Sequence, residues 1–457
     1  MRRHPPSRDE GPRTRPPDAL MSAEAPRGFL DAWNQLVGVA GLPTLPRRRG
    51  RKPRVPLSQL LPVLTFHVMQ GAGTLAEHLR QVFNTDLADS SWSDRRIRLP
   101  WAIFADLMRR TLRPRGTRRE HPDAFWRGWR LVALDGTQFS LTNTPQMAST
   151  IEKAKTRRGR AAFAKLTTAV LLEIGLHNPL AAAIGHRGQS EWELAHTVLA
   201  QLPKRALLLA DRLYGCAAFA AQALAVCQRV GSHFLMRARM YIKPRVIRRL
   251  RDGSRVIRVA VRQKGRPDRI LQWLELREIR VRVGRPGHRT HELRLWTSLV
   301  DPRTAPALEL AQLYAHRWEH ELYFRELKRQ LRKTALLQSH TVETAAQEIA
   351  ALVLVSALLA TERARAAAGH VPVLRVSFGK VLALIKPMWL TLQLGEDLLT
   401  DRVKTRMLTR AYTLMRQCLT PARRSRTCPR AVRQPVTRWP RLLHTQSIEG
   451  PFAFHVL

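Results

Sequence analysis

Two short apolar runs that each end in an aspartate constrain the fold of this chain more than any other feature of its sequence. Residues 129–134 read Trp-Arg-Leu-Val-Ala-Leu and lead into Asp135, and residues 206–210 read Ala-Leu-Leu-Leu-Ala and lead into Asp211. Short runs bounded by turn signals are typical of buried strands in a covered sheet. A carboxylate at such a strand end needs a cation, a salt bridge or a hydrogen-bond network. The two runs therefore predict an α/β layer whose acidic residues gather at one edge of the sheet.

A third acidic position follows in residues 313–333. Tyr314, Arg317, Glu321 and Lys328 are separated by two, three and six residues. At about 100° per residue they fall within roughly 60° of one another on a helix, so two cations and a phenol flank a carboxylate. Such a stripe suits a metal ion and a phosphate group. The alternative is a solvated, salt-bridged helix face, because Glu, Arg and Lys at these spacings stabilise exposed helices.

This spacing resembles the signature of the insertion-sequence-4 family of DDE transposases, in which the glutamate is the third metal-binding carboxylate. The stretches Asp135-Gly-Thr and Asp211-Arg-x-Tyr are similar to the local motifs of that family. The resemblance implies a catalytic triad of Asp135, Asp211 and Glu321, with Asp135 bridging two Mg²⁺ or Mn²⁺ ions and the other two each completing one coordination shell. Glu319 and Glu326 lie on the same helix, but only Glu321 satisfies all three gaps.

The resemblance also implies chemistry without a nucleophilic side chain. Two divalent ions about 4 Å apart can stabilise both the attacking and the leaving oxygen of a displacement at phosphorus. Water or a DNA 3′-hydroxyl would be the nucleophile. Tyr314, Arg317 and Lys328 would hold phosphates of the transposon end, although salt bridging on the helix surface explains the same residues. Arg212 is a further candidate DNA contact.

The charge of the chain agrees with a polynucleotide partner. Its 78 Lys and Arg residues against 35 Asp and Glu leave a formal charge of +43. Such a field attracts phosphate backbones without reading sequence. An acidic membrane surface fits less well, because the charge is spread along the chain and is not concentrated beside an apolar anchor. We expect double-stranded DNA, both transposon ends and target, as the partner, with a homodimer in the synaptic complex as the family implies.

The amino-terminal part has helical periodicity. Segments at residues 29–39, 57–68, 75–83 and 101–112 are separated by breaks that contain Pro or Gly. Residues 75–83 and 92–99 fit a helix-turn-helix that reads a groove of DNA, with Arg95, Arg96 and Arg98 as candidate contacts. Core packing of a helix pair explains this pattern equally well.

The expected fold class is α/β, and the resemblance makes the middle of the chain a ribonuclease-H-like catalytic core. Period-two alternation at residues 255–262 predicts strands with one basic face, which suits a β-rich insertion into that core. The expected order is a disordered basic amino terminus (1–28), a helical DNA-binding domain (29–120), the first part of the core (121–233), the insertion (234–300), the second part of the core with the glutamate helix (301–370), and a helical and basic carboxyl-terminal region (371–457).

Trp273 and Trp296 lie in the expected insertion. In this family a tryptophan of the insertion stacks a flipped base while a hairpin forms at the transposon end. Alignment on Thr297-Ser298 puts Leu293 at that position, so a hairpin intermediate is not implied. We expect both tryptophans to be buried in the core.

Three further features bear on the cellular location. Residues 349–360 form the most apolar run, but a dozen residues are too few to span a bilayer, so we expect a buried helix against the catalytic sheet. Four cysteines without zinc-type spacing are expected to be reduced. The amino end is no secretory signal, and Met21 is a candidate start. These features favour a soluble cytoplasmic protein associated with the nucleoid; the Arg- and Pro-rich tail beyond residue 421 suits a DNA-binding arm or a solubilising end.

No GxxxxGK, HExxH or GxSxG motif is present, which argues against nucleotide hydrolysis, zinc proteolysis and serine hydrolysis. The sequence therefore predicts a transposase that cleaves and transfers the strands of an insertion sequence by a cut-and-paste DDE mechanism. Two alternatives share its features: an inactive or repurposed DNA-binding relative, and a stand-alone ribonuclease-H-like nuclease.

Overall fold

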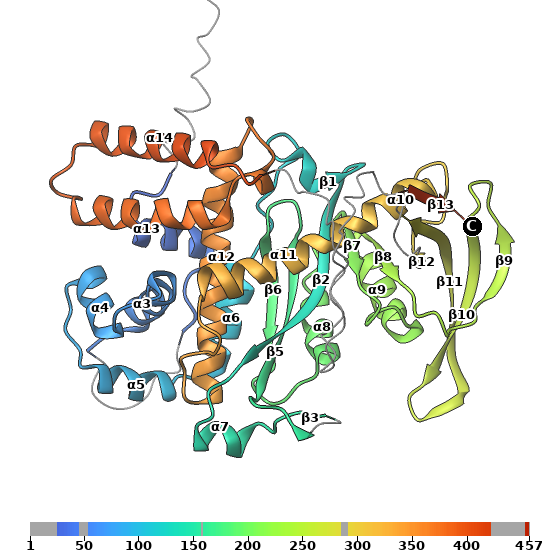
Figure 1. The fold of residues 1–457 in the computed structure, drawn as a ribbon, viewed down its shortest axis with the longest axis horizontal. Coiled ribbons are helices and arrows are strands. Elements are labelled where there is room, and N and C mark those ends of the chain that lie inside the picture. The colour runs from blue at the N-terminus through green and yellow to red at the C-terminus, as the bar shows by residue number, and fades with distance from the viewer. Residues whose placement is uncertain (1–24, 45–53, 157–158, 285–290, 422–452, 457) are drawn as a thin grey trace, which may run out of the picture.

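The computed structural model describes residues 25–44, 54–156, 159–284, 291–421 and 453–456. Within them the chain forms a mixed α/β fold in which one large sheet is flanked by helices (Figure 1). The predictions made for residues 1–24, and for the tail at residues 422–452, lie outside the described residues.

The middle of the chain forms one half of the sheet. Its strands lie in the order β6-β5-β2-β7-β8. Strands β2, β7 and β8 are parallel, while β5 is antiparallel to both of its neighbours. The bounds are β2 (Trp129–Ser140), β5 (Lys165–Glu173), β6 (Asn178–Ile184), β7 (Ala206–Ala210) and β8 (His233–Arg237).

Both predicted strands that lead into aspartates are present. Strand β7 ends where its apolar run ends, just before Asp211. Strand β2 is longer than predicted, because beyond Asp135 it keeps pairing with β5 as far as Ser140. Its parallel pairing with β7, however, stops at Leu134.

The other half of the sheet continues beyond β8 in the order β12-β11-β10-β9. These strands are β9 (Arg245–Arg249), β10 (Arg255–Gln263), β11 (Arg266–Gly284) and β12 (His291–Thr297). The alternation predicted for β10 is confirmed, since Val259 and Val261 are buried while Arg258 and Arg262 are exposed. The predicted boundary at residues 233/234 falls inside β8, which pairs with β7 and so belongs to the central strands.

Helices cover both faces of the central strands. Val132 and Leu134 of β2 pack in one cluster with α8 (Glu191–Leu199) and α9 (Ala217–Val230). Leu131 and Ala133 point to the other face and pack with α10 (Ala307–Tyr314). Successive side chains of a strand point to opposite faces, so the continuous apolar runs follow directly from burial on both sides.

Four amino-terminal helices lie where periodicity predicted them: α2 (Phe29–Val37), α3 (Leu57–Gln70), α4 (Leu75–Phe83) and α6 (Trp101–Thr111). Helix α5 (Asp89–Ile97) overlaps the segment at residues 92–99 but begins and ends earlier in the chain. Helix α4 begins with a capping box between Thr74 and Glu77. Helices α4 and α5 are the two halves of the predicted helix-turn-helix. The division of the chain into domains stays a prediction.

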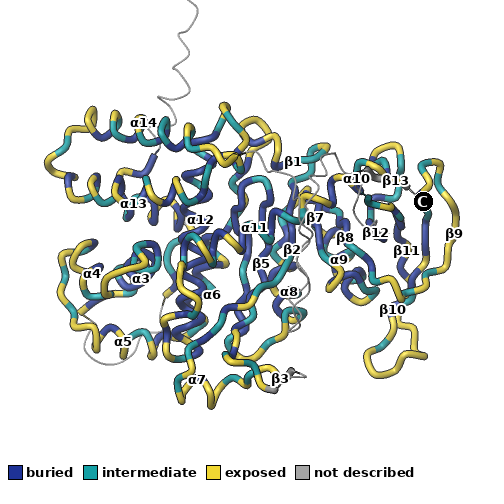
Figure 2. The backbone as a smooth tube through the Cα atoms, in the orientation of Figure 1, coloured by how far each residue is buried: buried dark blue, intermediate teal, exposed yellow. Residues whose placement is uncertain are grey.

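Helix α12 (Val342–Ala367) runs through the interior and contacts α3, α6, β6, α13 (Phe378–Leu394) and α14 (Asp401–Gln417). Its 26 residues include a window long and apolar enough to cross a membrane, and 94% of that window is buried inside the protein. The prediction of a buried helix is confirmed, but its reason was wrong, because the helix is long enough to span. Burial on all sides, dark blue in Figure 2, identifies α12 as a core helix.

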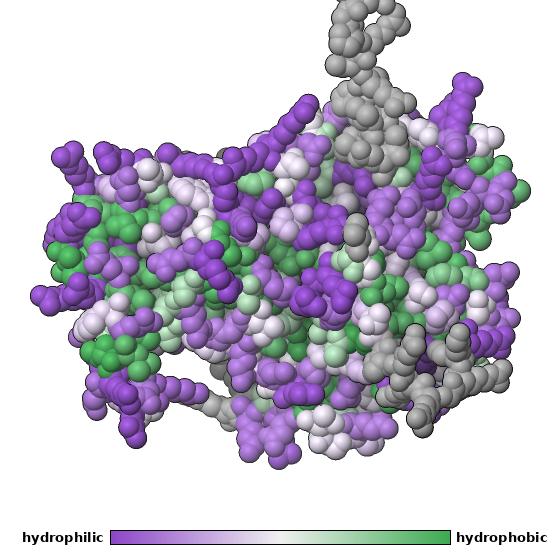
Figure 3. Space-filling model, turned by 180° about the vertical axis from the view of Figure 1, so that it is seen from behind, coloured by the Kyte–Doolittle hydropathy of each residue, from purple (hydrophilic) through white to green (hydrophobic). Residues whose placement is uncertain are grey.

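Short elements complete the described fold: η1 (Gly38–Ala40), η2 (Pro122–Ala124), β1 (Phe125–Trp126), α7 (Pro145–Thr150), β3 (Lys155–Thr156), β4 (Gly159–Arg160), η5 (Val373–Arg375) and β13 (Ala453–Val456). On the face seen in Figure 3, hydrophilic side chains occupy much of the rim, with hydrophobic patches between them.

Candidate active site

Asp135 and Asp211 lie at the same edge of the sheet. Leu134 and Ala210 are the last parallel pair of β2 and β7, and each is followed directly by one aspartate. Burial raises the pKa of Asp135 to about 7, and the nearby negative charges of Asp211 and Glu191 add to the effect. The structure thus confirms that the two carboxylates gather, as the strand-end pattern predicted.

The third carboxylate comes from a helical run that crosses the sheet edge (Figure 1). This run consists of α10, the 3₁₀ turn η3 (Ala315–Arg317), α11 (Trp318–Arg325) and the π-helical segment η4 (Glu326–Leu331). The prediction of one regular helix is therefore wrong in detail. The predicted stripe is nevertheless assembled, since three of its four residues bond to β2 or β7 or their ends. π-Helical turns are frequent at functional sites.

Arg317 links the aspartate edge to the helical run. Its Nη1 lies 3.2 Å from Oδ2 of Asp135, and its Nη2 lies 3.0 Å from Oε1 of Glu321. The side chains of Arg317 and Asp135 are only 16% and 15% exposed. A guanidinium is planar and carries several donors, so it can hold two carboxylates at once.

Tyr314 and Lys328 also contact the strands. The hydroxyl of Tyr314 donates to the carbonyl of Ala210 at 3.2 Å, next to Asp211. The Nζ of Lys328 donates to Oγ1 of Thr137 at 2.5 Å, and burial lowers the pKa of this ammonium to about 8. In this structure both side chains fix the helical run to the sheet, and their contact with DNA phosphates stays a prediction.

A divalent cation at this edge would need several oxygen ligands close together. Within the described residues no three His, Cys, Asp or Glu side chains converge closely enough to hold a metal ion. The chemistry of the donors nevertheless fits. The negative charge of Asp211 opposes the ionisation of Asp135, and carboxylate oxygens suit hard divalent cations as ligands. Arg317 now supplies positive charge between Asp135 and Glu321.

Sequence reasoning missed one carboxylate at this edge. Glu191, the first residue of α8, accepts a hydrogen bond of 2.8 Å from the hydroxyl of Tyr214. Burial raises the pKa of Glu191, and Asp211 contributes to the shift. Glu191 belongs to no motif that was recognised, and a glutamate at the start of a helix is common, so only its spatial neighbours distinguish it.

The candidate DNA contacts divide into inward and outward residues. Arg96 points inward, where it donates to Ser339, Gln347 and the carbonyl of Thr344. This arginine therefore joins α5 to α12, as the core-packing alternative expected. Arg98 is exposed directly after α5, and Arg212 is exposed beside Asp211. Arg95 is partly exposed.

The two tryptophans of the expected insertion differ. Trp296 is fully buried and donates to Glu278 at 3.2 Å. Trp273 is 53% exposed, so the prediction that both are buried is wrong for Trp273. Its strand β11 is long, and only the part of it beyond Trp273 is covered.

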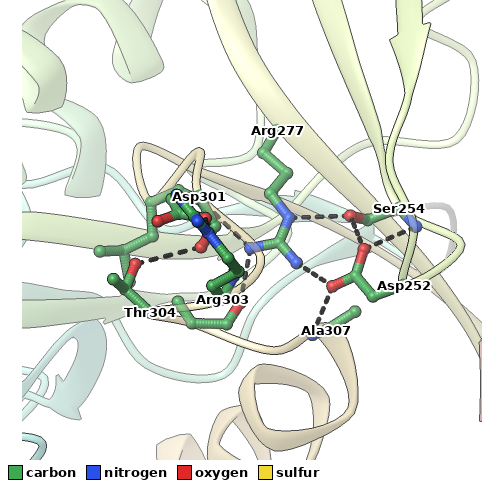
Figure 4. A network of polar contacts seen from close by, with 9 residues as sticks. Asp252, Ser254, Arg277, Asp301, Arg303, Thr304 and Ala307 are labelled. Atoms are coloured by element: carbon green, nitrogen blue, oxygen red, sulfur yellow. Dashed lines mark hydrogen bonds and ion pairs between the residues drawn. The ribbon is translucent and has the colours of Figure 1, made fainter.

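A buried polar network fixes the start of the helical run (Figure 4). Arg277 of β11 is fully buried and donates to Ser254 at 2.8 Å and to the carbonyl of Ala305 at 2.6 Å. It also pairs with Asp252, whose carboxylate accepts from the amide of Ala307 at 2.9 Å. Ala307 is the first residue of α10. The strands beyond β8 thus hold the helix that leads to Arg317 and Glu321.

The other end of the run is held by a second network. His177 bonds to Glu326 at 2.7 Å and to Glu319 at 3.2 Å, and Arg363 of α12 bonds to Glu326 at 3.2 Å. All four side chains are buried. The glutamates beside Glu321 therefore face the interior, which separates them from the sheet edge.

Comparison with known proteins defines the class. The model of the family "Transposase DDE domain" matches residues 126–358, which is half of the chain. This range contains Asp135, Asp211 and Glu321. The chain belongs to the DDE transposase family, and one of its relatives is named as the transposase of insertion sequence element IS4.

One relative is the transposase InsG for insertion sequence element IS4 of Escherichia coli (strain K12). It is 27% identical over 333 residues, which cover 70% of this chain and 71% of InsG. InsZ of the same strain is 33% identical over 129 residues, covering 28% of this chain and 43% of InsZ. A solved structure of a piggyBac transposase synaptic complex with hairpin DNA is also similar to this chain. The matched region covers 86% of this chain and 82% of the piggyBac chain, with 9% sequence identity and a TM-score of 0.42.

Proposed function

We propose that this protein cleaves DNA at the ends of an insertion sequence and joins the freed 3′-hydroxyls to target DNA, by a metal-dependent cut-and-paste mechanism. The observation that carries the proposal is the meeting of Asp135 and Asp211 at one sheet edge, with Glu321 joined to Asp135 through Arg317. Membership of the DDE transposase family supports it.

We infer a ribonuclease-H-like core for this chain. The strand order β6-β5-β2-β7-β8, with only β5 running against its neighbours, supports the inference. Strands β9 to β12 would be the β-rich insertion, because they separate Asp211 from Glu321 in the sequence. They extend the same sheet and do not form a separate layer.

Asp135, Asp211 and Glu321 would hold two Mg²⁺ or Mn²⁺ ions. When bound, such ions stabilise the attacking and leaving oxygens of a displacement at phosphorus. The residues of the chain have their own tasks. Asp135 and Asp211 supply two like negative charges at the sheet edge. Arg317 holds Glu321 near Asp135 as long as neither DNA nor metal competes for these contacts. Lys328 and Arg317 would then take phosphate oxygens.

Double-stranded DNA would be the partner, and the net charge of +43 supports it. A homodimer would pair two element ends in one synaptic complex. The protein would act in the cytoplasm, in association with the nucleoid, where such a DNA substrate is found.

The test is cleavage of linear DNA carrying the ends of the element, with Mg²⁺ or Mn²⁺. We expect nicks at the element boundary from the unchanged protein and none from Asp135→Asn, Asp211→Asn or Glu321→Gln proteins that still bind DNA. Equal binding without metal-dependent cutting by any of the four proteins would contradict the proposal and favour a DNA-binding relative. Equal cutting of unrelated DNA would favour a stand-alone nuclease.

A further inference from the structure

Glu191 packs directly against the backbone of Gly136, the residue that follows Asp135. A Cβ atom on Gly136 would lie 2.2 Å from Cδ of Glu191 and 2.6 Å from its Oε1. Both distances are far shorter than a real contact. Glycine at position 136 therefore leaves the space that the Glu191 carboxyl group fills, and the Gly of Asp135-Gly136-Thr137 has a physical reason in this fold.

Gly136 brings Glu191 and Asp135 to the same stretch of strand. The amide of Gly136 donates to Oδ1 of Asp135 at 2.9 Å, while its α-carbon borders the Glu191 carboxyl group. The two carboxyl groups thus adjoin one residue of β2. They come from elements far apart in the sequence, a strand and the first turn of α8.

Tyr214 ties Glu191 to the second aspartate. Its hydroxyl donates to Oε1 of Glu191 at 2.8 Å, and its ring is fully buried. Tyr214 lies in the turn that follows β7, and its amide donates to the carbonyl of Asp211 at 3.2 Å. Contacts with Gly136 of β2 and with Tyr214 after β7 therefore fix the position of Glu191 relative to both strands that lead into the aspartates.

The start of helix α8 does not require this glutamate. Ser190 is the N-cap, and Glu193 closes the capping box by accepting from the amide of Ser190 at 2.8 Å. Glu193 is exposed and supplies acidic charge to the first turn. Glu191 instead turns its carboxylate to the sheet edge, where a third like charge is unfavourable unless a cation joins it.

We propose that Glu191 is a fourth acidic residue of the divalent-cation site, on the opposite side of β2 and β7 from Glu321. This inference rests on the proposed function, because it assigns Glu191 to the same Mg²⁺ or Mn²⁺ site. Glu191 adds negative charge at the end of the site where Asp135 and Asp211 meet. Tyr214 is a positioning residue that holds the carboxylate of Glu191 in place.

The assignment is tested by measuring the binding of Mn²⁺ to the full chain without DNA. Binding is detected as a loss of the electron paramagnetic resonance signal of the free ion. Four variants are compared with the unchanged protein: Asp135→Asn, Glu191→Gln, Glu191→Asp and Glu193→Gln. Asp135→Asn reports whether the proposed site binds metal at all. Glu191→Asp keeps an acidic residue at the start of α8 but withdraws the carboxylate from Gly136, so it separates a role at the metal from a role in the helix.

We expect Asp135→Asn, Glu191→Gln and Glu191→Asp each to weaken Mn²⁺ binding by about tenfold or more, and Glu193→Gln to change it by less than about twofold. If Asp135→Asn weakens binding while both Glu191 variants bind like the unchanged protein, the inference is overturned and the proposed function stands. If the unchanged protein binds no Mn²⁺ at this site, both are overturned. A parallel loss in Glu193→Gln would also overturn the inference, because it would point to the helix.

Discussion

Arg317 and Asp135 form a largely buried ion pair, with Nη1 of the arginine 3.2 Å from Oδ2 of the aspartate. The same guanidinium reaches Glu321. Asp135 and Glu321 lie far apart in the sequence, and the arginine of the signature binds both. These ion pairs bring the helical run to the sheet edge. The chemistry of the site depends on this link.

We therefore expect Arg317→Gln to reduce element-end cleavage by about 100-fold, while DNA binding falls by less than about threefold. The side chain of glutamine is neutral and forms no ion pair with either carboxylate, so Asp135 and Glu321 lose the cation that they share. Single-turnover cleavage and filter binding measure the two quantities. Arg329→Gln, an exposed change on the same helical run, is the matched control, and an equal loss of cleavage there would refute the role of the link.

Gly136→Ala should destabilise the protein by about 2 kcal/mol, because its new methyl group would overlap the carboxyl group of Glu191. Adding Glu191→Ala should recover at least half of this free energy of unfolding. Urea denaturation of the two single variants and the double variant measures the coupling. Additive losses would show that the two residues are not in contact.

Asp252→Ala should loosen the start of α10. The variant removes both the partner of Arg277 and the acceptor for the amide of Ala307. We expect a loss of about 3 kcal/mol, as for other broken buried pairs, and faster hydrogen exchange in residues 307–314. Asp301→Ala is the control, because its ion-pair partner Arg303 is 91% exposed, and such pairs contribute little.

His177 should make stability depend on pH. Burial opposes its charge, but the carboxylates of Glu326 and Glu319 outweigh burial and raise the pKa of His177 above its ordinary 6.5. A raised folded-state pKa stabilises the protein fully below pH 6.5, and this stability is lost as the pH rises through the folded value. His177→Gln should therefore cost about 3 kcal/mol at pH 6.

The cost of His177→Gln should be smaller at pH 9 than at pH 6, and urea denaturation at both values checks it. The lowered pKa of Glu326, which follows from His177 and Arg363 overcoming the effect of burial, adds stability above pH 4.5 that is lost in acid. An equal cost at both pH values would show that His177 is neutral in the folded protein.

The two tryptophans should respond in opposite ways. Trp296→Ala should cost about 4 kcal/mol, because it empties a fully buried site and leaves Glu278 without one donor. Trp273→Ala should change the free energy of unfolding by less than about 0.5 kcal/mol, because the side chain is half exposed. Thermal and urea denaturation compare them, and a large loss for Trp273 would mean that a second surface covers it.

Local patterns determined much of this protein. Apolar runs predicted the strands that end beside Asp135 and Asp211, since burial on both faces leaves no polar alternation to mask them. Periodicity predicted the amino-terminal helices, and fixed gaps between Tyr314, Arg317, Glu321 and Lys328 predicted one stripe. These signals work because strand and helix geometry repeats over a few residues.

Tertiary structure alone decided the rest, because the deciding contacts join residues that no local period relates. It turned Arg96 inward to α12, left Trp273 exposed at the outer part of β11, and surrounded the membrane-length helix α12 with the chain itself. It also carried Glu191 from the start of α8 to the space beside Gly136. Such proximity depends on the order and direction of the strands, whereas a glutamate at a helix start looks the same in any sequence.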